Sequence, residues 1–349
     1  MSLASADGRR QVVVCEDSPT YAQALRRALE HGGDLEVVGV YPRAEEAIEA
    51  LPRLRPDVVT MDLELPGISG LDAVEKIMGT HPLPILVLSA HVGPESESAA
   101  AALAAGALDA IHKEGLELAE PGGASAAGLR DRVKLLSGIP VIRHPRIAIR
   151  TSRQRAADGP RSAAVIGICA STGGPSALAT ILGSVRPSFP VPILVVQHIS
   201  PGFTDGFVRW LDGAIPLPVR AAEDGAALAG GIWVAPEGAH LLLDPSGRLR
   251  LDRSKKGSHR PSADALLTSL AESAGRAAVG IVLTGMGRDG SEGVVAIRKA
   301  GGVTIVQDEE TSVVYGMPKA AADAGAEQVL PVHEIGPRLL HFRLVPLPK

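Results

Sequence analysis

The 349-residue chain has few aromatic side chains, few cysteines and no long apolar run. Phe, Trp and Tyr make up 3% of its residues, so its cores must be built from Ala, Val, Leu and Ile. No apolar run approaches the ~20 residues that a membrane-spanning helix needs, and residues 1–10 lack the apolar core of a signal peptide. Cys15 and Cys169 each fall within an expected strand or at its end, which indicates reduced, buried thiols. We therefore expect a cytoplasmic protein that does not insert into a membrane.

A large net charge is also missing. The formal net charge of -4 at pH 7 gives no reason to expect nucleic acid as a partner. Hydrophobic residues are 45% and charged residues 21% of the chain, which suits globular α/β domains. A chain of this length is expected to form two domains.

Strand-like apolar runs alternate with helical patterns in the N-terminal part of the chain. From Tyr21 to Glu30, the apolar residues Ala24, Leu25, Ala28 and Leu29 follow the spacing of one helix face. The expected strands are residues 11–15, 35–40, 57–61, 85–88 and 107–111. This repeat of βα units predicts a doubly wound parallel sheet.

Polar groups follow the ends of these strands, where functional groups of a doubly wound sheet collect. They are Glu16, Asp17, Asp62, Ser89 and Lys113. One acid after one strand is usually a solvated turn residue, but matching groups after several strands indicate a site. Three carboxylates suit Mg²⁺. A lysine and a hydroxyl beside them could neutralise and hydrogen-bond a phosphoryl group.

This segment, about residues 10–136, resembles the flavodoxin-like receiver domain of two-component response regulators. The resemblance rests on Glu16-Asp17, Asp62 within residues 61–70, Ser89-Ala90 and Lys113. It implies that Asp62 accepts a phosphoryl group from a histidine kinase. It also implies that Glu16, Asp17 and Asp62 hold Mg²⁺, and that Ser89 and Lys113 form the receiver switch.

Two positions depart from the receiver pattern. Ala110 stands three residues before Lys113, where receivers usually have Tyr or Phe, so an aromatic rotamer switch is unavailable. Glu114 follows Lys113 where receivers usually have proline. A cis bond at that point would be a non-proline one, which costs about 2.5–4 kcal/mol. We expect phosphorylation to survive these changes.

Periodicity fades over residues 137–162, which we interpret as a basic interdomain linker. Prolines fall at positions 140, 145 and 160. The segment contains one acid, Asp158, and six arginines: Arg143, Arg146, Arg150, Arg153, Arg155 and Arg161. The alternative is a basic docking strip for an acidic partner.

The second half is organised around Ser171. A short apolar run ends there, and Gly173, Gly174 and Pro175 follow before a helical pattern at residues 176–182. This predicts a buried strand, a tight turn and a helix N-terminus, where an acyl-transfer nucleophile would find donors for its oxyanion. A helix cap or a phosphate ligand is the alternative.

Two familiar templates do not fit this turn. It is not the Gly-x-Ser-x-Gly elbow, because Cys169 stands where the first glycine belongs. It is not a P-loop, because no Lys-Ser or Lys-Thr pair follows the glycines.

Two further polar residues come just past strand ends. His198 follows the expected strand 191–196, and Asp289 follows the expected strand 278–283 ahead of a helix at 291–300. On one rim with Ser171, His198 would take the serine proton and Asp289 would orient the imidazole. The N–H groups of Thr172 and Met286 are candidate oxyanion donors. His240 and His259 are rival bases in less regular surroundings.

This half, residues 163–345, resembles the catalytic domain of the chemotaxis protein-glutamate methylesterases. The shared stretches are residues 170–175, 196–198, 201–204, 259–264, 283–290, 307–309 and 315–318. The resemblance implies a Rossmann-like α/β hydrolytic domain with Ser171, His198 and Asp289 as its triad.

It further implies a phosphorylation-regulated serine hydrolase, found in the cytoplasm at chemoreceptor arrays. The enzyme would demethylate glutamate γ-methyl esters on chemoreceptors, releasing methanol, and deamidate glutamines. Hydrolysis would need no metal, since Mg²⁺ belongs to the receiver, and a chemotaxis histidine kinase would be the other partner.

Two other functions stay open. One is a receiver joined to a nucleotide-binding module. The Gly-rich turn favours it, but Gln197-His198 stands where an acid would hold the ribose. The other is a non-catalytic regulator that has kept the fold.

Overall fold

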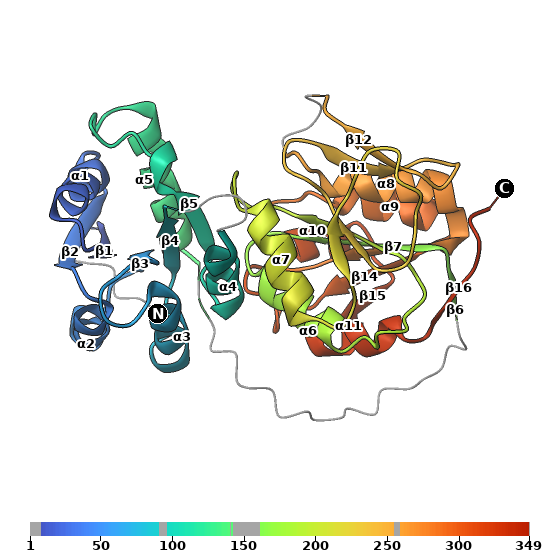
Figure 1. The fold of residues 1–349 in the computed structure, drawn as a ribbon, viewed down its shortest axis with the longest axis horizontal. Coiled ribbons are helices and arrows are strands. Elements are labelled where there is room, and N and C mark those ends of the chain that lie inside the picture. Colours follow the sequence, from blue (N-terminus) through green and yellow to red (C-terminus); the bar gives the residue numbers. More distant parts are fainter. Residues whose placement is uncertain (1–7, 91–95, 140, 142–160, 255–258, 349) are drawn as a thin grey trace. The chain divides into compact units, whose positions relative to one another are not determined.

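The computed structural model describes residues 8–90, 96–139, 141, 161–254 and 259–348. The chain divides into two compact units, each built on its own parallel sheet (Figure 1). Most of the expected linker, residues 142–160, lies outside the described residues, and with it five of the six arginines of the alternative docking strip. The sixth, Arg161, pairs with Glu327 at 2.6 Å. Arg161 and Ser162, at its end, lie in a short strand.

The first unit alternates strands and helices. Its five strands pair in parallel in the order β2-β1-β3-β4-β5, which confirms the doubly wound sheet. The elements are β1 Arg10–Cys15, α1 Pro19–Glu30, β2 Leu35–Tyr41, α2 Ala44–Leu54, β3 Val58–Asp62, α3 Gly70–Thr80, β4 Ile85–Ser89, α4 Glu97–Ala105, β5 Asp109–His112 and α5 Ala124–Ser137.

Local sequence explains why α1 begins where it does. Ser18 accepts a hydrogen bond from Tyr21 N at 3.4 Å, and Pro19 occupies the first helical position, where a missing N–H costs nothing. Leu25 and Leu29 are fully buried one turn apart. Helix α1 therefore packs one face on the sheet and leaves the opposite face to solvent.

The second unit carries a larger sheet. Its seven strands are parallel, in the order β15-β14-β13-β7-β8-β10-β9. The elements are β6 Arg161–Ala163, β7 Val165–Ala170, α6 Gly174–Gly183, β8 Ile193–Gln197, α7 Thr204–Ala214, β9 Val219–Ala221, β10 Ile232–Val234, β11 His240–Leu243, β12 Leu249–Asp252, α8 Ala263–Ala274, β13 Ala278–Val282, α9 Ser291–Lys299, β14 Val303–Gln307, α10 Met317–Asp323, β15 Gln328–Leu330, α11 Val332–Leu339 and β16 Phe342–Leu344.

Strand β7 is the centre of this sheet. The chain runs outward from it through β8 on one side and returns to β13 on the other, so the strand order reverses between β7 and β13. Such a switch point opens a crevice at the carboxyl ends of the strands, where α/β proteins place their ligands. Ser171 follows β7 at this point.

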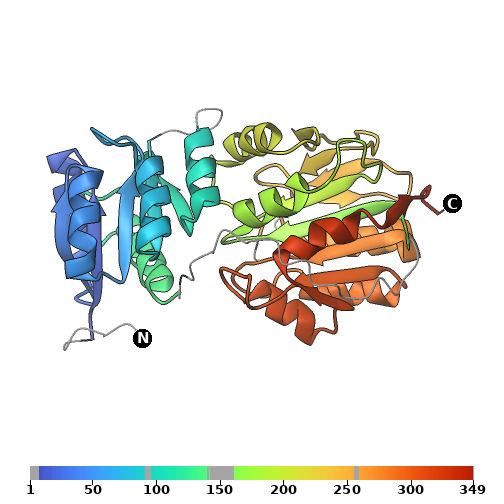
Figure 2. The ribbon, with the colours of Figure 1, turned by 90° about the horizontal axis from the view of Figure 1, so that it is seen from below.

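Helices cover both faces of each sheet (Figures 1 and 2). In the second unit α6 packs against α11, and α8 packs against α9 and β7. The core beneath α8 and α9 is aliphatic, as the shortage of aromatics requires; it includes Leu266, Leu267, Leu270, Val282, Val294 and Ile297. At about 25 cal/mol per Å² of apolar surface removed from water, this burial is the main force that holds the two helices on the sheet.

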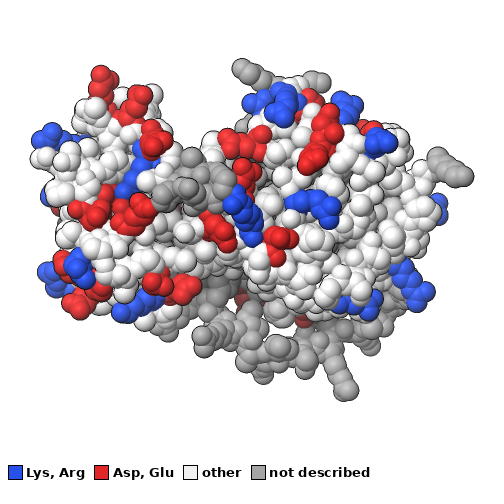
Figure 3. All heavy atoms as spheres, in the orientation of Figure 1, with Lys and Arg blue, Asp and Glu red and all other residues white. Residues whose placement is uncertain are grey.

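The described surface is mixed in charge. Figure 3 shows Lys and Arg interspersed with Asp and Glu on the face in view, without a continuous area of either sign. No helix in the described part of the chain is long and apolar enough to cross a membrane. Both cysteines are buried and free, as expected.

Candidate functional site

Ser171 and His198 come directly after adjacent strands. The last pair of the β7–β8 ladder joins Ala170 to Gln197, so the next residue on each strand is the expected nucleophile or base. His198 N donates to Ala170 O at 2.9 Å, which continues the ladder by one step. Because neighbouring parallel strands are about 4.8 Å apart, the two side chains start within reach of each other.

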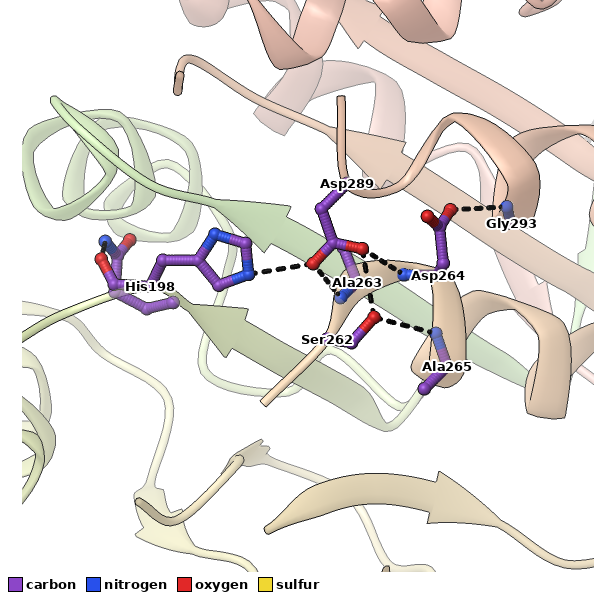
Figure 4. A network of polar contacts seen from close by, with 8 residues as sticks. His198, Ser262, Ala263, Asp264, Ala265, Asp289 and Gly293 are labelled. Atoms are coloured by element: carbon purple, nitrogen blue, oxygen red, sulfur yellow. Dashed lines mark hydrogen bonds and ion pairs between the residues drawn. The ribbon is translucent and has the colours of Figure 1, made fainter. Parts of the chain in front are cut away.

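Asp289 reaches His198 from the loop after β13. Asp289 Oδ2 lies 2.9 Å from His198 Nε2 (Figure 4). Strand β7 lies between β13 and β8, so this contact spans the end of β7, where Ser171 lies. The structure therefore places the three expected residues at one rim of one sheet.

The Asp289 carboxylate is fixed by the N-terminus of α8. It accepts hydrogen bonds from Ser262 Oγ at 3.0 Å, Ala263 N at 2.8 Å and Asp264 N at 2.9 Å (Figure 4). Burial alone would raise the pKa of Asp289. The bonds from His198 and from the two backbone N–H groups outweigh it and hold that pKa well below its ordinary value. Asp289 is therefore a permanent anion that can orient the imidazole and stabilise its protonated form.

Gln197 joins the backbones of the nucleophile and base positions. Its Nε2 donates to Ser171 O at 2.9 Å and to His198 O at 2.8 Å. The side chain is 5% exposed, so both bonds form away from water. These bonds also commit Gln197 to the protein backbone, whereas a nucleotide site would need an acid free to bind ribose.

Thr284 ties the turn after Ser171 to the loop before Asp289. Its Oγ1 donates to Thr172 O at 2.9 Å, and its carbonyl accepts from Ser171 N at 3.0 Å. Gln307 Oε1 in turn accepts from Thr284 N at 2.8 Å. Within the described residues, the N–H groups of Thr172 and Met286 have no hydrogen-bond partner. They are therefore available to an oxyanion.

The two rival histidines have different surroundings. His240 is 3% exposed and lies in the β11–β12 hairpin, where Leu241 is its buried neighbour. His259 stacks on His198, with ring centroids 4.7 Å apart and planes 11° apart. Burial, and then His198, lower the pKa of His259. This stacking supports the His198 ring from one side. The sequence alone did not predict it.

The first unit gathers its acids in the same way. The β1–β3 ladder ends at Cys15 and Met61, so Glu16 and Asp62 follow side by side. Lys113 Nζ lies 2.6 Å from Asp62 Oδ2 and 2.8 Å from Glu16 Oε2. Ser89 is buried at the end of β4.

Two buried carboxylates share one cation here. Burial raises the pKa of Glu16 and of Asp62, and the hydrogen bonds to Lys113 oppose that rise. Burial would lower the pKa of Lys113, but its bonds to the two acids raise it. One possible ligand atom from each of Glu16, Asp17 and Asp62 lies within 4.8 Å of the others. Three hard oxygens with an excess of negative charge fit Mg²⁺.

The departures from the receiver pattern have visible consequences. Position 110, in β5, carries the methyl group of a fully buried alanine, so there is no aromatic ring to turn there. Among the described residues the only cis peptide bond precedes Pro261, so the Lys113–Glu114 bond is trans. The centroid of the Tyr21 ring lies 5.0 Å from Lys113 Nζ. An aromatic side chain therefore contacts the acidic site from α1, which the sequence pattern did not reveal.

Comparisons with known proteins agree with both halves of this description. A family model described as "Response regulator receiver domain" matches residues 12–118. Another, described as "CheB methylesterase", matches residues 166–339.

Full-length relatives are similar along the whole chain. A protein-glutamate methylesterase/protein-glutamine glutaminase 2 of Anaeromyxobacter dehalogenans is 43% identical, over 97% of this chain and 98% of the relative. A protein-glutamate methylesterase/protein-glutamine glutaminase 3 of Myxococcus xanthus is 45% identical, over 90% of this chain and 88% of the relative. Among solved structures, the Thermotoga maritima CheB methylesterase catalytic domain is 39% identical, covers 51% of this chain and 98% of its own, and has a TM-score of 0.49.

Gly174 provides a direct test of the packing around Gln197. A Cβ at this position would overlap Gln197 Oε1 and lie 2.8 Å from Ala170 Cβ. We expect Gly174→Ala to lower the free energy of unfolding by about 1–3 kcal/mol, the usual cost of overpacking. Thermal and urea unfolding would measure it.

Gly183→Ala is the matched control, because Gly183 lies in the same helix and a Cβ there would have no neighbour within 4 Å. We expect this variant to be neutral or slightly more stable than the wild type. Equal stability of the two variants would contradict the close fit of Gln197 against Gly174.

Proposed function

The chain belongs to the CheB-type protein-glutamate methylesterase/protein-glutamine glutaminase family, and we propose that Ser171, His198 and Asp289 are its catalytic triad. It is an enzyme whose receiver domain regulates the demethylation of chemotaxis receptors. We further propose that residues 10–136 form the receiver, 137–162 the linker and 163–345 the catalytic domain.

The His198–Asp289 pair beside Ser171 carries this proposal. Asp289 Oδ2 lies 2.9 Å from His198 Nε2, so Nε2 faces the carboxylate and Nδ1 is the ring nitrogen left to take a proton. Proton transfer from Ser171 would therefore run to Nδ1. The more familiar triads use the opposite nitrogen for each task.

In the first half-reaction, Ser171 Oγ attacks the γ-carbonyl carbon of a methylated glutamate. His198 Nδ1 takes the serine proton as the C–O bond forms, and Asp289 stabilises the imidazolium. The N–H groups of Thr172 and Met286 would meet the carbonyl oxygen as it becomes an oxyanion. Collapse of the tetrahedral intermediate breaks the ester bond, and methanol leaves with the proton from His198.

In the second half-reaction, water replaces methanol. His198 takes a proton from the water as its oxygen attacks the carbonyl carbon of the acyl-serine. Collapse of the second tetrahedral intermediate breaks the bond to Ser171 Oγ, which regains a proton from His198, and the receptor glutamate is released. A glutamine side chain would follow the same route with ammonia as the leaving group. The residues named account for every proton transfer, so we assign Mg²⁺ to the receiver alone.

In the receiver, Asp62 would accept the phosphoryl group from a chemotaxis histidine kinase. Glu16, Asp17 and Asp62 would hold Mg²⁺, which neutralises charge on the transferring phosphoryl group. Lys113 is already an ion-pair partner of Asp62 and would contact the added oxygens. Ser89 would hydrogen-bond them from the end of β4. We place the enzyme in the cytoplasm at chemoreceptor arrays, where its methylated substrates are.

The triad can be tested by substitution. We expect Ser171→Ala and His198→Ala each to lower kcat by about 10³- to 10⁶-fold, and the double variant little further, because triad members act as a unit. Methanol release from methylated receptor membranes measures the rate. Asp289→Asn should cost somewhat less. A Ser171→Ala enzyme with more than about a tenth of wild-type activity would show that another group is the nucleophile.

The phospho-acceptor can be tested by labelling. A small phosphodonor with Mg²⁺ should phosphorylate the full-length wild type and leave Asp62→Asn unlabelled, because only the carboxylate can form the acyl phosphate. Asp57→Asn is the matched control: Asp57 is buried near the start of β3 and pairs with Arg10 at 3.3 Å. Labelling that persists in Asp62→Asn, or without Mg²⁺, would overturn the assignment.

Regulation can be measured on the intact chain. If the inactive form is favoured by about 1–3 kcal/mol, phosphorylation should raise the demethylation rate about 5- to 150-fold. Asp62→Asn should show the unphosphorylated rate with and without the phosphodonor. Equal rates for phosphorylated and unphosphorylated wild type would mean that Asp62 does not control this site.

A further inference from the structure

The N-termini of α8 and α9 are linked by two carboxylates. Asp289, two residues before α9, accepts hydrogen bonds from Ala263 N and Asp264 N in the first turn of α8. In the reverse direction, Asp264 Oδ1 accepts from Gly293 N at 2.8 Å, in the first turn of α9 (Figure 4). Each helix thus supplies an acceptor for the free N–H groups of the other.

This exchange fixes the direction as well as the position of Asp289. Both helix N-termini carry partial positive charge, which favours the two carboxylates. The helices also pack along their lengths: Gly293 has Leu267 as its nearest neighbour, and a Cβ there would lie 2.5 Å from Leu267 Cβ. A change at Asp264 would therefore move the start of α9 and the loop that carries Asp289.

We propose that Asp264 is a positioning residue for catalysis, which holds the Asp289 carboxylate against His198 by anchoring the first turn of α9 to α8. The inference rests on the proposed function, in which Asp289 acts through His198. Asp264 itself touches neither substrate nor the reacting atoms.

The charge of Asp264 adds to this role. Burial raises its pKa to about 6, and the Asp289 carboxylate raises it too, against the Gly293 hydrogen bond. The titratable groups that face it are Asp289, Glu292 of α9 and Cys169 of β7, whose own thiol pKa is raised by burial. Above about pH 6, the ionised Asp264 places a second negative charge behind Asp289. That charge favours the imidazolium formed in the transition state.

Ionisation has a stability cost with a defined direction. Because the native pKa of Asp264, about 6, lies above the ordinary value of 3.8, the folded protein retains a proton that the unfolded chain has released. The contribution of Asp264 to stability is therefore full below about pH 3.8 and is lost as pH rises from there to about 6. Asp264 thus opposes folding at the pH where its charge assists catalysis.

The test compares three variants of the full-length protein. Asp264→Ala removes the acceptor for Gly293 N, and we expect kcat to fall about 10- to 100-fold with KM little changed, because misplacement acts on the chemical step. Asp264→Asn keeps an oxygen acceptor and should restore most of kcat at acidic pH. The ratio of wild-type to Asp264→Asn kcat should then rise from about pH 5 to about pH 7, as wild-type Asp264 ionises. Glu272→Gln removes an exposed charge near the C-terminal end of α8, two turns from Asp264, and should change none of these values.

Stability gives a readout that does not depend on activity. Relative to wild type, Asp264→Asn should become more stable as pH rises from about 4 to about 7, since it lacks the costly ionisation. The positioning role would be overturned if both Asp264→Asn and Asp264→Ala kept the kcat of the wild type and if the ratio of wild-type to Asp264→Asn kcat did not change with pH. If Asp264→Ala does not fold, Asp264→Glu takes its place, because it keeps the charge but moves the acceptor for Gly293 N by one methylene; an unchanged kcat in that variant would overturn the positioning role. Activity retained in Ser171→Ala would instead overturn the proposed function, so the two failures are distinct.

Discussion

The hydrogen-bonded Asp289 carboxylate is the constraint on which the catalytic half depends. A carboxylate with 8% of its side chain exposed would cost several kcal/mol if it had no partners. Here the N-terminus of α8 and His198 supply those partners, so the charge stays ionised in place. The same contacts fix the imidazole from one side. Gln197 and Thr284 hold the backbone of Ser171 and Thr172 from the other side, so the two sets of bonds together fix the rim.

The two units both bury carboxylates, but burial and hydrogen bonding contribute differently to the carboxylate pKa values in each. In each, a buried carboxylate at or past the end of a parallel strand needs partners: Asp62 has Lys113, and Asp289 has His198 and backbone N–H groups of α8. The receiver gives Glu16 and Asp62 one lysine and few backbone donors, so burial prevails and their pKa values rise. The catalytic half surrounds Asp289 with donors, so its pKa falls. The first arrangement suits recruitment of Mg²⁺ and phosphoryl oxygens, and the second suits a fixed partner for histidine.

Residues at strand ends could be predicted from the sequence because a parallel sheet brings all its carboxyl ends to one edge. That rule located Ser171, His198 and Asp289, as well as Glu16, Asp62 and Lys113. It could not predict the side-chain contacts between elements, such as Gln197 with two carbonyls or Asp264 with Gly293 N, since no local pattern encodes which helices meet. The three- and four-residue strands β9 to β12 were not predicted for a related reason. Each is too short to show periodicity, and pairing alone defines it.

The buried Ala110 limits how phosphorylation can act. A phosphoryl group on Asp62 would replace the single carboxylate charge with about two charges on phosphoryl oxygens, a net gain of about one negative charge next to Glu16 and Asp17. In the proposed mechanism, Lys113, now shared between two carboxylates, would turn toward the phosphoryl oxygens, and a Mg²⁺ held by the three acids would offset part of the charge. Since position 110 carries no ring, we infer that the change starts from Lys113 and from the backbone that follows β5. The Tyr21 ring, 5.0 Å from the ammonium, is the aromatic group placed to respond when that lysine moves.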